Sequence, residues 1–380
     1  MKNKNISFYV CILCVVSILL GALIIVRHNE VARIISRITY DEFDRYSYEE
    51  LKEINNSLSS AKHNNPMRNC ILGYIEYKLY NYNTAMEYFY DIVNSNSDDY
   101  FSKELAYIGI MQIQYDNNEL ELGDATRKEL KQLYKKYNND DIRWYADIVY
   151  AKELLENEKY KEAINVVKGT LDLKVDYKKT SKSFSFLSKI YTVIDSFEVA
   201  KLYANNALVT SYSIGDKEYI IQALLNCAQT YYCRNSYLET ISICNKILDE
   251  YDDIPLDYAI YVYRYLYASY LSISDLKSAK MIETLYKDRV EELPKQEKQK
   301  EYIRIYSSLS MYYSSVKSTD EALYYLNLAS RYEYDPNGNL SYLIEKARLD
   351  YEYSISSGDN YDLLLEEYEI LLNNYRRLIV

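Results

Sequence analysis

The chain has 380 residues, 48% of them hydrophobic, and a formal net charge of −11, which argues against broad binding to nucleic acid. It holds only two histidines, so a histidine base or a histidine-rich metal site is nearly excluded by number alone. Four prolines and eight glycines are few for this length and favour an almost entirely helical protein.

The N-terminal segment 6–26 is an apolar run without a charged side chain, preceded by Lys2 and Lys4 and followed by Arg27. A run of about 20 residues is long enough to span a membrane. A cleaved signal peptide normally has a shorter run and a small-residue cleavage site, and no good site follows here. We therefore predict a short tail over residues 1–5 and an uncleaved transmembrane anchor over residues 6–26.

The charges around this run bear on its orientation. Lys2, Lys4 and the free amine hold the tail on the cytoplasmic side, whereas Arg27, Arg33 and Arg37 pull the other way. Because a short charged tail is hard to translocate, we predict a single-pass protein of the cell membrane with its repeats outside the cytoplasm. The free-looking thiols are a weak argument against that side.

Residues 27–66 are predicted to form a helical connector and N-terminal cap. Apolar residues keep helical spacing between Val31 and Ile38 and again over 48–58, before Asn64, Asn65 and Pro66 end the segment. A repeat array needs such a cap because its end unit has one face unstacked.

From residue 67 onward the apolar pattern predicts helices in pairs. The expected ranges are 67–79 with 83–94, 101–115 with 124–137, 142–156 with 160–170, four pairs centred on Ala200, Thr240, Ala279 and Ala322, and 340–356 with 361–377.

Small residues recur at fixed places in these pairs, in units of roughly forty residues, because two antiparallel helices approach closely only where a small side chain faces the partner. In the first helix of a pair this position is filled by Gly73, Gly109, Ala151, Ser188, Ala228 and Ser310. In the second helix it is filled by Ala85, Ala163, Ala200, Thr240, Ala279 and Ala322.

The clearest copies of the repeat combine a leucine, a small residue and a tyrosine with a later row of alanines. One copy has Leu309, Ser310 and Tyr313, then Ala322, Leu326 and Ala329, and another has Leu187, Ser188 and Tyr191, then Ala200, Ala204 and Ala207. Over residues 67–380 this pattern resembles the tetratricopeptide repeat family, with units nearer to about 40 residues than to the usual 34. It departs from the family at Glu76, where a tyrosine is expected, and at Trp144, which lies away from the family's tryptophan position.

The resemblance implies an all-α fold, an α-α superhelix of tetratricopeptide type, here preceded by the single transmembrane helix. In that family the first helix of each pair lines an inner face that holds an extended peptide or a helix of a partner. Carried onto this sequence by the repeat register, the partner-binding residues are Tyr74, Tyr77, Lys78, Tyr145, Lys152, Lys182, Lys189, Gln222, Gln229, Tyr232, Tyr261, Arg264 and Arg304.

This set contains lysine and arginine but no acidic residue, although the chain is acidic. A basic, tyrosine-rich groove favours an acidic peptide or a terminal carboxylate, because charged donors fix the anion and aromatic rings supply contact area. The alternative is that these residues are ordinary solvated positions of helices.

No motif for chemistry is found. The sequence has no phosphate-binding glycine loop, nucleophile elbow, HExxH motif or calcium loop, and paired carboxylates such as Asp252 and Asp253 are adjacent and expected to be solvated. We expect no enzyme activity, no cofactor and no metal. Cys227 and Cys244 fall where facing helices touch, and they are either small buried thiols or a disulfide.

The sequence thus predicts a membrane-anchored scaffold that binds a protein or peptide partner through the concave face of its repeats, and no nucleic acid. The alternative is a peptide-sensing regulator that acts through a separate output protein. The apolar C-terminal end, from Leu363 to Val380, is expected either to fold onto the array or to serve as a face for self-association.

Overall fold

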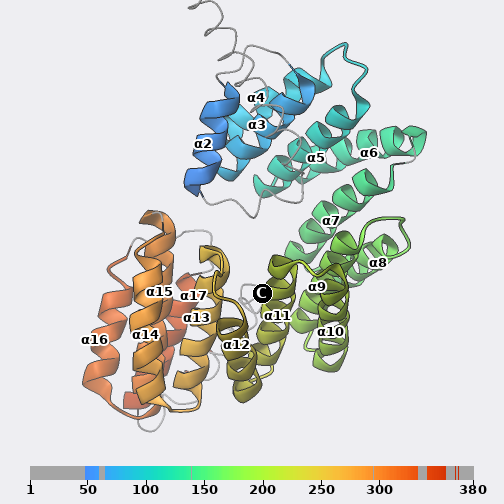
Figure 1. The fold of residues 1–380 in the computed structure, drawn as a ribbon. Helices are drawn as coiled ribbons and strands as arrows, with labels where there is room; N and C mark the ends of the chain where they lie inside the picture. The colour runs from blue at the N-terminus through green and yellow to red at the C-terminus, as the bar shows by residue number, and fades with distance from the viewer. Residues whose placement is uncertain are drawn as a thin grey trace, which may run out of the picture. The chain divides into compact units, whose positions relative to one another are not determined.

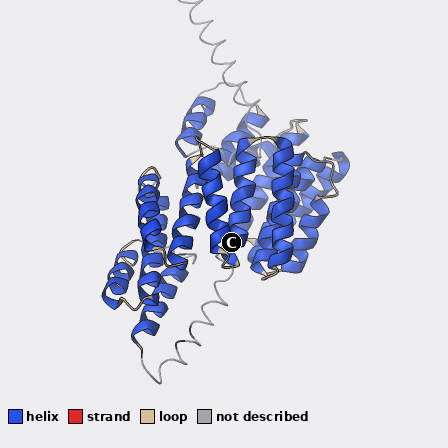
Figure 2. Ribbon diagram, turned by 60° about the horizontal axis from the view of Figure 1, so that its bottom comes forward, coloured by secondary structure: helices blue, strands red, loops and turns tan. Residues whose placement is uncertain are grey.

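The computed structural model describes residues 48–59, 65–137, 139–293, 295–332 and 340–356, together with residues 364 and 367. All regular structure in these residues is α-helix (Figures 1 and 2). The all-α prediction is therefore confirmed for the part of the chain that the structure describes. The chain divides into two compact units, Met1–Val149 and Tyr150–Val380.

The first unit contains short helices that pack in sequence order. They are α2 (Tyr48–Ser59), α3 (Pro66–Lys78), α4 (Tyr82–Val93), α5 (Tyr100–Asp116), α6 (Leu120–Tyr137) and the start of α7 (Asp140–Glu156). The predicted helix over 48–58 and the two pairs that follow agree closely with these bounds.

The second unit continues the same alternation. Its helices are the end of α7, α8 (Tyr160–Thr170), α9 (Tyr177–Val193), α10 (Phe197–Ile214), α11 (Lys217–Cys233), α12 (Tyr237–Glu250), α13 (Leu256–Ser272), α14 (Leu276–Val290), α15 (Lys295–Ser315), α16 (Thr319–Ala329) and α17 (Ser341–Ile355).

Seven turns of one type join helices into hairpins within the described residues. In each, the second residue after the first helix has a positive φ, between 56° and 63°, a conformation that side chains other than glycine adopt uncommonly. These residues are Tyr80, Asn118, Glu158, Asp195, Asn235, Ser274 and Lys317. The next backbone N–H reaches back to the fifth preceding carbonyl, as from Asn81 to Glu76 at 2.9 Å, which satisfies a carbonyl at the helix end. The turns recur every 37 to 43 residues, so the repeat has a regular structural unit.

Aspartates begin several of the first helices. The carboxylates of Asp99, Asp176 and Asp216 accept hydrogen bonds from backbone N–H groups in the first turns of α5, α9 and α11. Such a cap satisfies a donor that the helix cannot pair internally. The caps therefore mark where each new hairpin starts.

The predicted small residues lie where the two helices of a hairpin meet, and all are buried. The hydroxyl of Ser188 donates to the carbonyl of Ala200 at 2.8 Å, and that of Ser310 donates to the carbonyl of Ala322 at 2.9 Å. Contacts this short require backbones that approach closely, as the small-residue pattern predicts.

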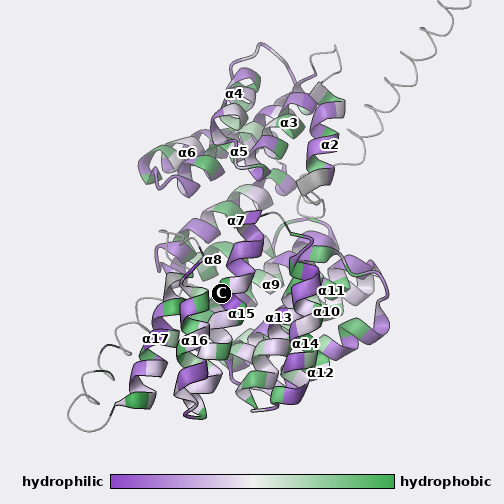
Figure 3. Cartoon of the chain, turned by 90° about the vertical axis from the view of Figure 1, so that its left-hand side faces the viewer, coloured by the Kyte–Doolittle hydropathy of each residue, from purple (hydrophilic) through white to green (hydrophobic). Residues whose placement is uncertain are grey.

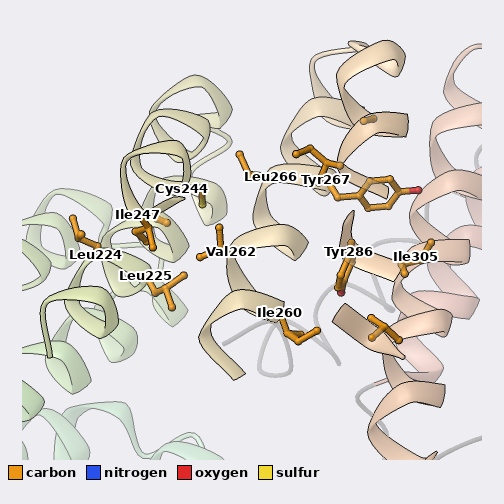
Figure 4. Packing of buried hydrophobic residues seen from close by; sticks show 14 of the residues in the cluster. Leu224, Leu225, Cys244, Ile247, Ile260, Val262, Leu266, Tyr267, Tyr286 and Ile305 are labelled. Carbon is orange, nitrogen blue, oxygen red and sulfur yellow. The ribbon is translucent and has the colours of Figure 1, made fainter. Parts of the chain in front are cut away.

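Large side chains fill the spaces between neighbouring hairpins. In the second unit one continuous core runs from Leu224 on α11 through Ile247 and Val262 to Tyr286 and Ile305 (Figure 4). Hydrophobic (green) and hydrophilic (purple) residues are interspersed along the helices in Figure 3. From α9 to α17 in the second unit, each hairpin thus stacks on the next one along the chain, which is the arrangement of a helical repeat.

Four cysteines of the described residues, Cys70, Cys227, Cys233 and Cys244, are free thiols. Burial raises the pKa of Cys227 and of Cys244 to about 12, so both stay protonated. Between the two alternatives left open by the sequence, the structure confirms small buried thiols.

The localisation prediction requires correction. In the part of the chain that the structure describes, no helix has the length and apolar character needed to cross a membrane. This finding overturns the prediction of a single-pass protein of the cell membrane with its repeats outside the cytoplasm. The predicted tail 1–5, the predicted anchor 6–26, most of the connector 27–66 and the predicted helix 361–377 lie outside the described ranges, apart from residues 364 and 367.

Candidate binding face

The first helices of the hairpins lie side by side in the second unit. Their lateral contacts join α9 to α11, α11 to α13, α13 to α15 and α15 to α17. The contacts are made by Lys182 with Tyr219, Tyr232 with Tyr265, Arg264 with Glu301, and Met311 with Lys346. We call the surface formed by the first helices the first-helix face, defined by Lys182, Lys189, Gln222, Asn226, Gln229, Tyr232, Tyr261, Arg264, Glu301 and Arg304.

Burial raises the pKa of Tyr232 on α11, and the charges of Lys346 and Tyr342 on α17 also act on it. Helices α11 and α17 are three hairpins apart along the chain, so first helices that are not neighbours in sequence act on one another electrostatically.

Asn226 is the most unusual side chain of this face. It lies on α11 between Gln222 and Gln229, one turn from each, and is 6% exposed. Both the nitrogen and the oxygen of its side-chain amide are buried without a hydrogen-bond partner. A buried unpaired polar group costs roughly 1–3 kcal/mol, so such groups call for a specific explanation.

Helical spacing relates Lys189 on α9 to this asparagine on α11. The ammonium group of Lys182 is 5.9 Å from the ring of Tyr219, and Lys189 and Asn226 each lie seven residues further along the same two helices. Seven residues are two helical turns, so the same faces meet again at that level. Burial lowers the pKa of Lys189, and no partner of its ammonium group is found among the described residues.

Arg264 and Arg304 meet at the other end of the face, around Glu301. Arg264 donates from Nε to Oε2 of Glu301 at 3.2 Å and from Nη2 to Oε1 at 2.5 Å, and its guanidinium lies 4.4 Å from the ring centre of Tyr261. Burial alone would raise the pKa of Glu301, but Arg264, Arg304 and a hydrogen bond from Tyr286 lower it overall. Glu301 is therefore a carboxylate held inside a cationic surface.

Other predicted site residues of the second unit lie at or near the surface. Lys152 is exposed and its ammonium group is 3.8 Å from Glu156, while Lys182, Gln222, Gln229 and Tyr232 are half-buried. Tyr261 is 44% exposed. Each of these side chains keeps part of its surface exposed.

The predicted residues of the first unit do not behave as one surface. Tyr74 is 3% exposed and its hydroxyl donates to the carbonyl of Leu105 at 2.6 Å, and Tyr145 is buried against Trp144. We correct both assignments, because the hydroxyl of Tyr74 is already paired within the fold and the ring of Tyr145 packs on Trp144, so neither side chain is offered to a partner. Tyr77 donates from its hydroxyl to Asp116 at 2.6 Å, and Lys78 lies 6.0 Å from the Tyr77 ring.

Two residues of the first-helix face are absent from the sequence prediction. Asn226 shares one helical ridge with Gln222 and Gln229, so the same spacing could have found it. Glu301 precedes Arg304 by one turn and corrects the expectation of a face without acidic residues. Its offset of 37 residues from Arg264 equals the offset between Lys182 and Tyr219, which is the signal that could have revealed it.

Two solved structures of Rap proteins are similar to this chain in fold. A Rap protein complexed with competence and sporulation factor matches with a TM-score of 0.57 and 14% identity, over 94% of this chain and 88% of that chain. The apo form of RapI matches with a TM-score of 0.54 and 13% identity, over 81% of this chain and 86% of that chain.

A third solved structure is a signal transduction ATPase with numerous domains from Pyrococcus horikoshii, which carries a tetratricopeptide repeat sensor. The match has a TM-score of 0.50 and 15% identity and covers 94% of this chain but 50% of that one, so the chain spans half its length. No family model and no curated protein sequence matches the chain. At these identities the likeness shows the fold alone, and that fold is an all-α helical repeat of tetratricopeptide type.

Proposed function

We propose that the protein binds an extended segment of a partner, a peptide or part of a protein, along the first-helix face of its second unit. The observation that carries this proposal is the unpaired amide of Asn226. One donor and one acceptor side by side match the C=O and N–H of a bound peptide backbone, so binding would satisfy both atoms at once.

The charges and the neighbours support the same proposal. Arg304 is a cation on this face in a chain of net charge −11, which favours a partner with acidic side chains. One protein of the same fold is a Rap protein solved with competence and sporulation factor bound. The protein would act by binding, without a reaction of its own.

Selection of peptides from a randomised library by the purified full chain tests this function. The wild-type protein should enrich a set of peptides, and Asn226→Leu should lose that enrichment while remaining folded. Asn205→Leu, the same change at an exposed position of α10, is the matched control and should enrich the wild-type set. Failure of the wild-type protein to enrich any peptide, or full enrichment by Asn226→Leu, would contradict the proposal.

A second candidate is a regulator that senses a peptide and passes the signal to a separate output protein. The observation favouring it is that the solved structures of this fold include a tetratricopeptide repeat sensor. The two candidates differ in what peptide binding does. A regulator should gain or lose a protein partner when a selected peptide is added, which a pull-down with and without that peptide would measure.

A further inference from the structure

Two guanidinium groups share one carboxylate at the α13–α15 end of the first-helix face. Glu301 accepts two hydrogen bonds from Arg264 and one from the hydroxyl of Tyr286. The side chain of Glu301 is 4% exposed, so this pair forms the buried base of the cluster. Both carboxylate oxygens are already used by these donors.

Arg304 is the second guanidinium, and it is held loosely. Its Nε lies 3.4 Å from Oε1 of Glu301 but is buried without a hydrogen bond, and its side chain is 30% exposed. Within the described residues its guanidinium makes no other ion pair or hydrogen bond. The cluster therefore carries one net positive charge, with the N–H donors of Arg304 unmet.

The unpaired N–H donors of Arg304 and the single excess positive charge determine which ligand the cluster can bind. A guanidinium presents parallel N–H groups that match the two oxygens of a carboxylate. One carboxylate neutralises the single excess charge, whereas a phosphate monoester would bring close to two negative charges. Arg264 cannot serve instead, because Glu301 and the ring of Tyr261 already occupy its guanidinium.

We infer that Arg304 binds the side-chain carboxylate of an aspartate or glutamate in the partner segment. This inference rests on the proposed function, since the partner must lie along the first-helix face to bring a carboxylate there. Glu301 is a positioning residue. It pairs with Arg264 in the buried base of the cluster, so the excess positive charge lies on Arg304. Tyr261, exposed beside the cluster, offers a ring for the methylene groups of the bound side chain.

Titrations followed by the Nε–Hε NMR signal of Arg304 test the inference on the full chain. The probes are N-acetylglutamate N-methylamide, its neutral glutamine counterpart, and methyl phosphate. The glutamate probe should shift the signal saturably, with an affinity about 10-fold or more above that of the glutamine probe, since hydrogen bonds to charged groups are the stronger ones. Equal shifts from the glutamate and glutamine probes, or no shift from either, would overturn the inference. Tighter binding of methyl phosphate would replace the carboxylate with a phosphate and overturn it too.

Variants assign the signal and separate the two proposals. Arg304→Gln should remove both the signal and glutamate binding, and Arg304→Lys, kept as a conservative variant, should bind the probe more weakly than wild type. Arg289→Gln, on the exposed side of α14, should bind as wild type does. Peptides enriched by the wild-type chain should be rich in acidic residues and lost by Arg304→Gln. Enriched peptides without acidic residues would overturn the inference and leave the proposed function standing, whereas no enrichment would fail the proposed function itself.

Discussion

At the scale of single residues, the protein keeps polar groups in places where an apolar side chain would be more stable. Asn226 leaves two amide atoms unpaired, and Arg304 leaves its Nε unpaired beside a carboxylate that Arg264 has already taken. Such costs are expected where a binding partner completes the hydrogen bonds. By contrast, the seam residues Ser188 and Ser310 each donate a hydrogen bond to a carbonyl of the facing helix.

Replacing Asn226 by leucine should stabilise the free protein. The change removes two buried unpaired atoms and keeps a side chain of similar size, so the free energy of unfolding should rise by about 1 kcal/mol. Urea unfolding of both proteins measures the difference. Ser188→Ala is the opposite control, because it removes hydrogen bonds that are made, and should lower stability by a similar amount. A marked loss of stability in Asn226→Leu would show that its amide is satisfied in the free protein.

Glu104 should give the first unit a pH dependence. Burial raises the pKa of this carboxyl above its ordinary value of 4.5, although Asn139 donates a weak hydrogen bond to it. The folded state therefore holds the proton more tightly than the unfolded chain, and stability falls as the pH rises from below 4.5 through the raised pKa.

Glu104→Gln tests this dependence. The variant should be more stable than the wild type at pH 7, and the advantage should shrink as the pH falls toward 4. Urea unfolding across that range measures it, with Glu87→Gln on the exposed face of α4 as the matched control. An advantage that is constant across the range would refute the assignment to ionisation of Glu104.

At the scale of helices, the hairpin is the unit that the sequence encodes most clearly. Small residues on both helices must face each other for the backbones to approach, so their spacing predicted the hairpins and most helix bounds to within a few residues. The turns were less accessible, because their left-handed position is filled by seven residues of six different types rather than by glycine. Because helix packing fixes the geometry of these turns, the type of residue at the left-handed position does not reveal it.

The candidate site was harder to predict because each first helix packs both against its own hairpin partner and against neighbouring hairpins. Tyr74 follows the seam residue Gly73 directly and reaches the next hairpin at Leu105, so its tyrosine ring belongs to the core. Arg264 and Arg304 lie on first helices, as the repeat register predicted, but their partner Glu301 depends on a lateral contact between hairpins. Long-range contacts of this kind do not appear in the periodicity of a single helix.

The packing of the first hairpin gives a sharp test with two glycines. A Cβ at Gly73 would lie 2.6 Å from the Phe89 ring, so Gly73→Ala should destabilise the protein by about 1–3 kcal/mol through overpacking. Gly169 in α8 has nothing within 4 Å of the same atom, so Gly169→Ala should be neutral or stabilising by up to about 1 kcal/mol. Thermal unfolding compares them, and equal effects would contradict the close approach of α3 and α4.

At the scale of the whole molecule, the two units repeat the same hairpin. Buried polar atoms without a hydrogen-bond partner occur in both, at Oε1 of Glu104 in the first unit and at Asn226 and Arg304 in the second, but those two lie on the first-helix face. The chain has a net charge of −11, so Arg304 places a positive charge on the surface of an acidic protein. Recognition is therefore expected on the second unit, through side chains that the fold leaves unsatisfied.

Site-specific photocrosslinking tests this account most directly. A photoreactive amino acid placed at Gln229, on the first-helix face, is compared in the full chain with the same group at Leu238, which is 68% exposed on α12. The account predicts crosslinks to a peptide or protein from Gln229, none from Leu238, and loss of the Gln229 crosslinks in Asn226→Leu. Crosslinks from Leu238 alone, or Gln229 crosslinks that survive Asn226→Leu unchanged, would contradict it.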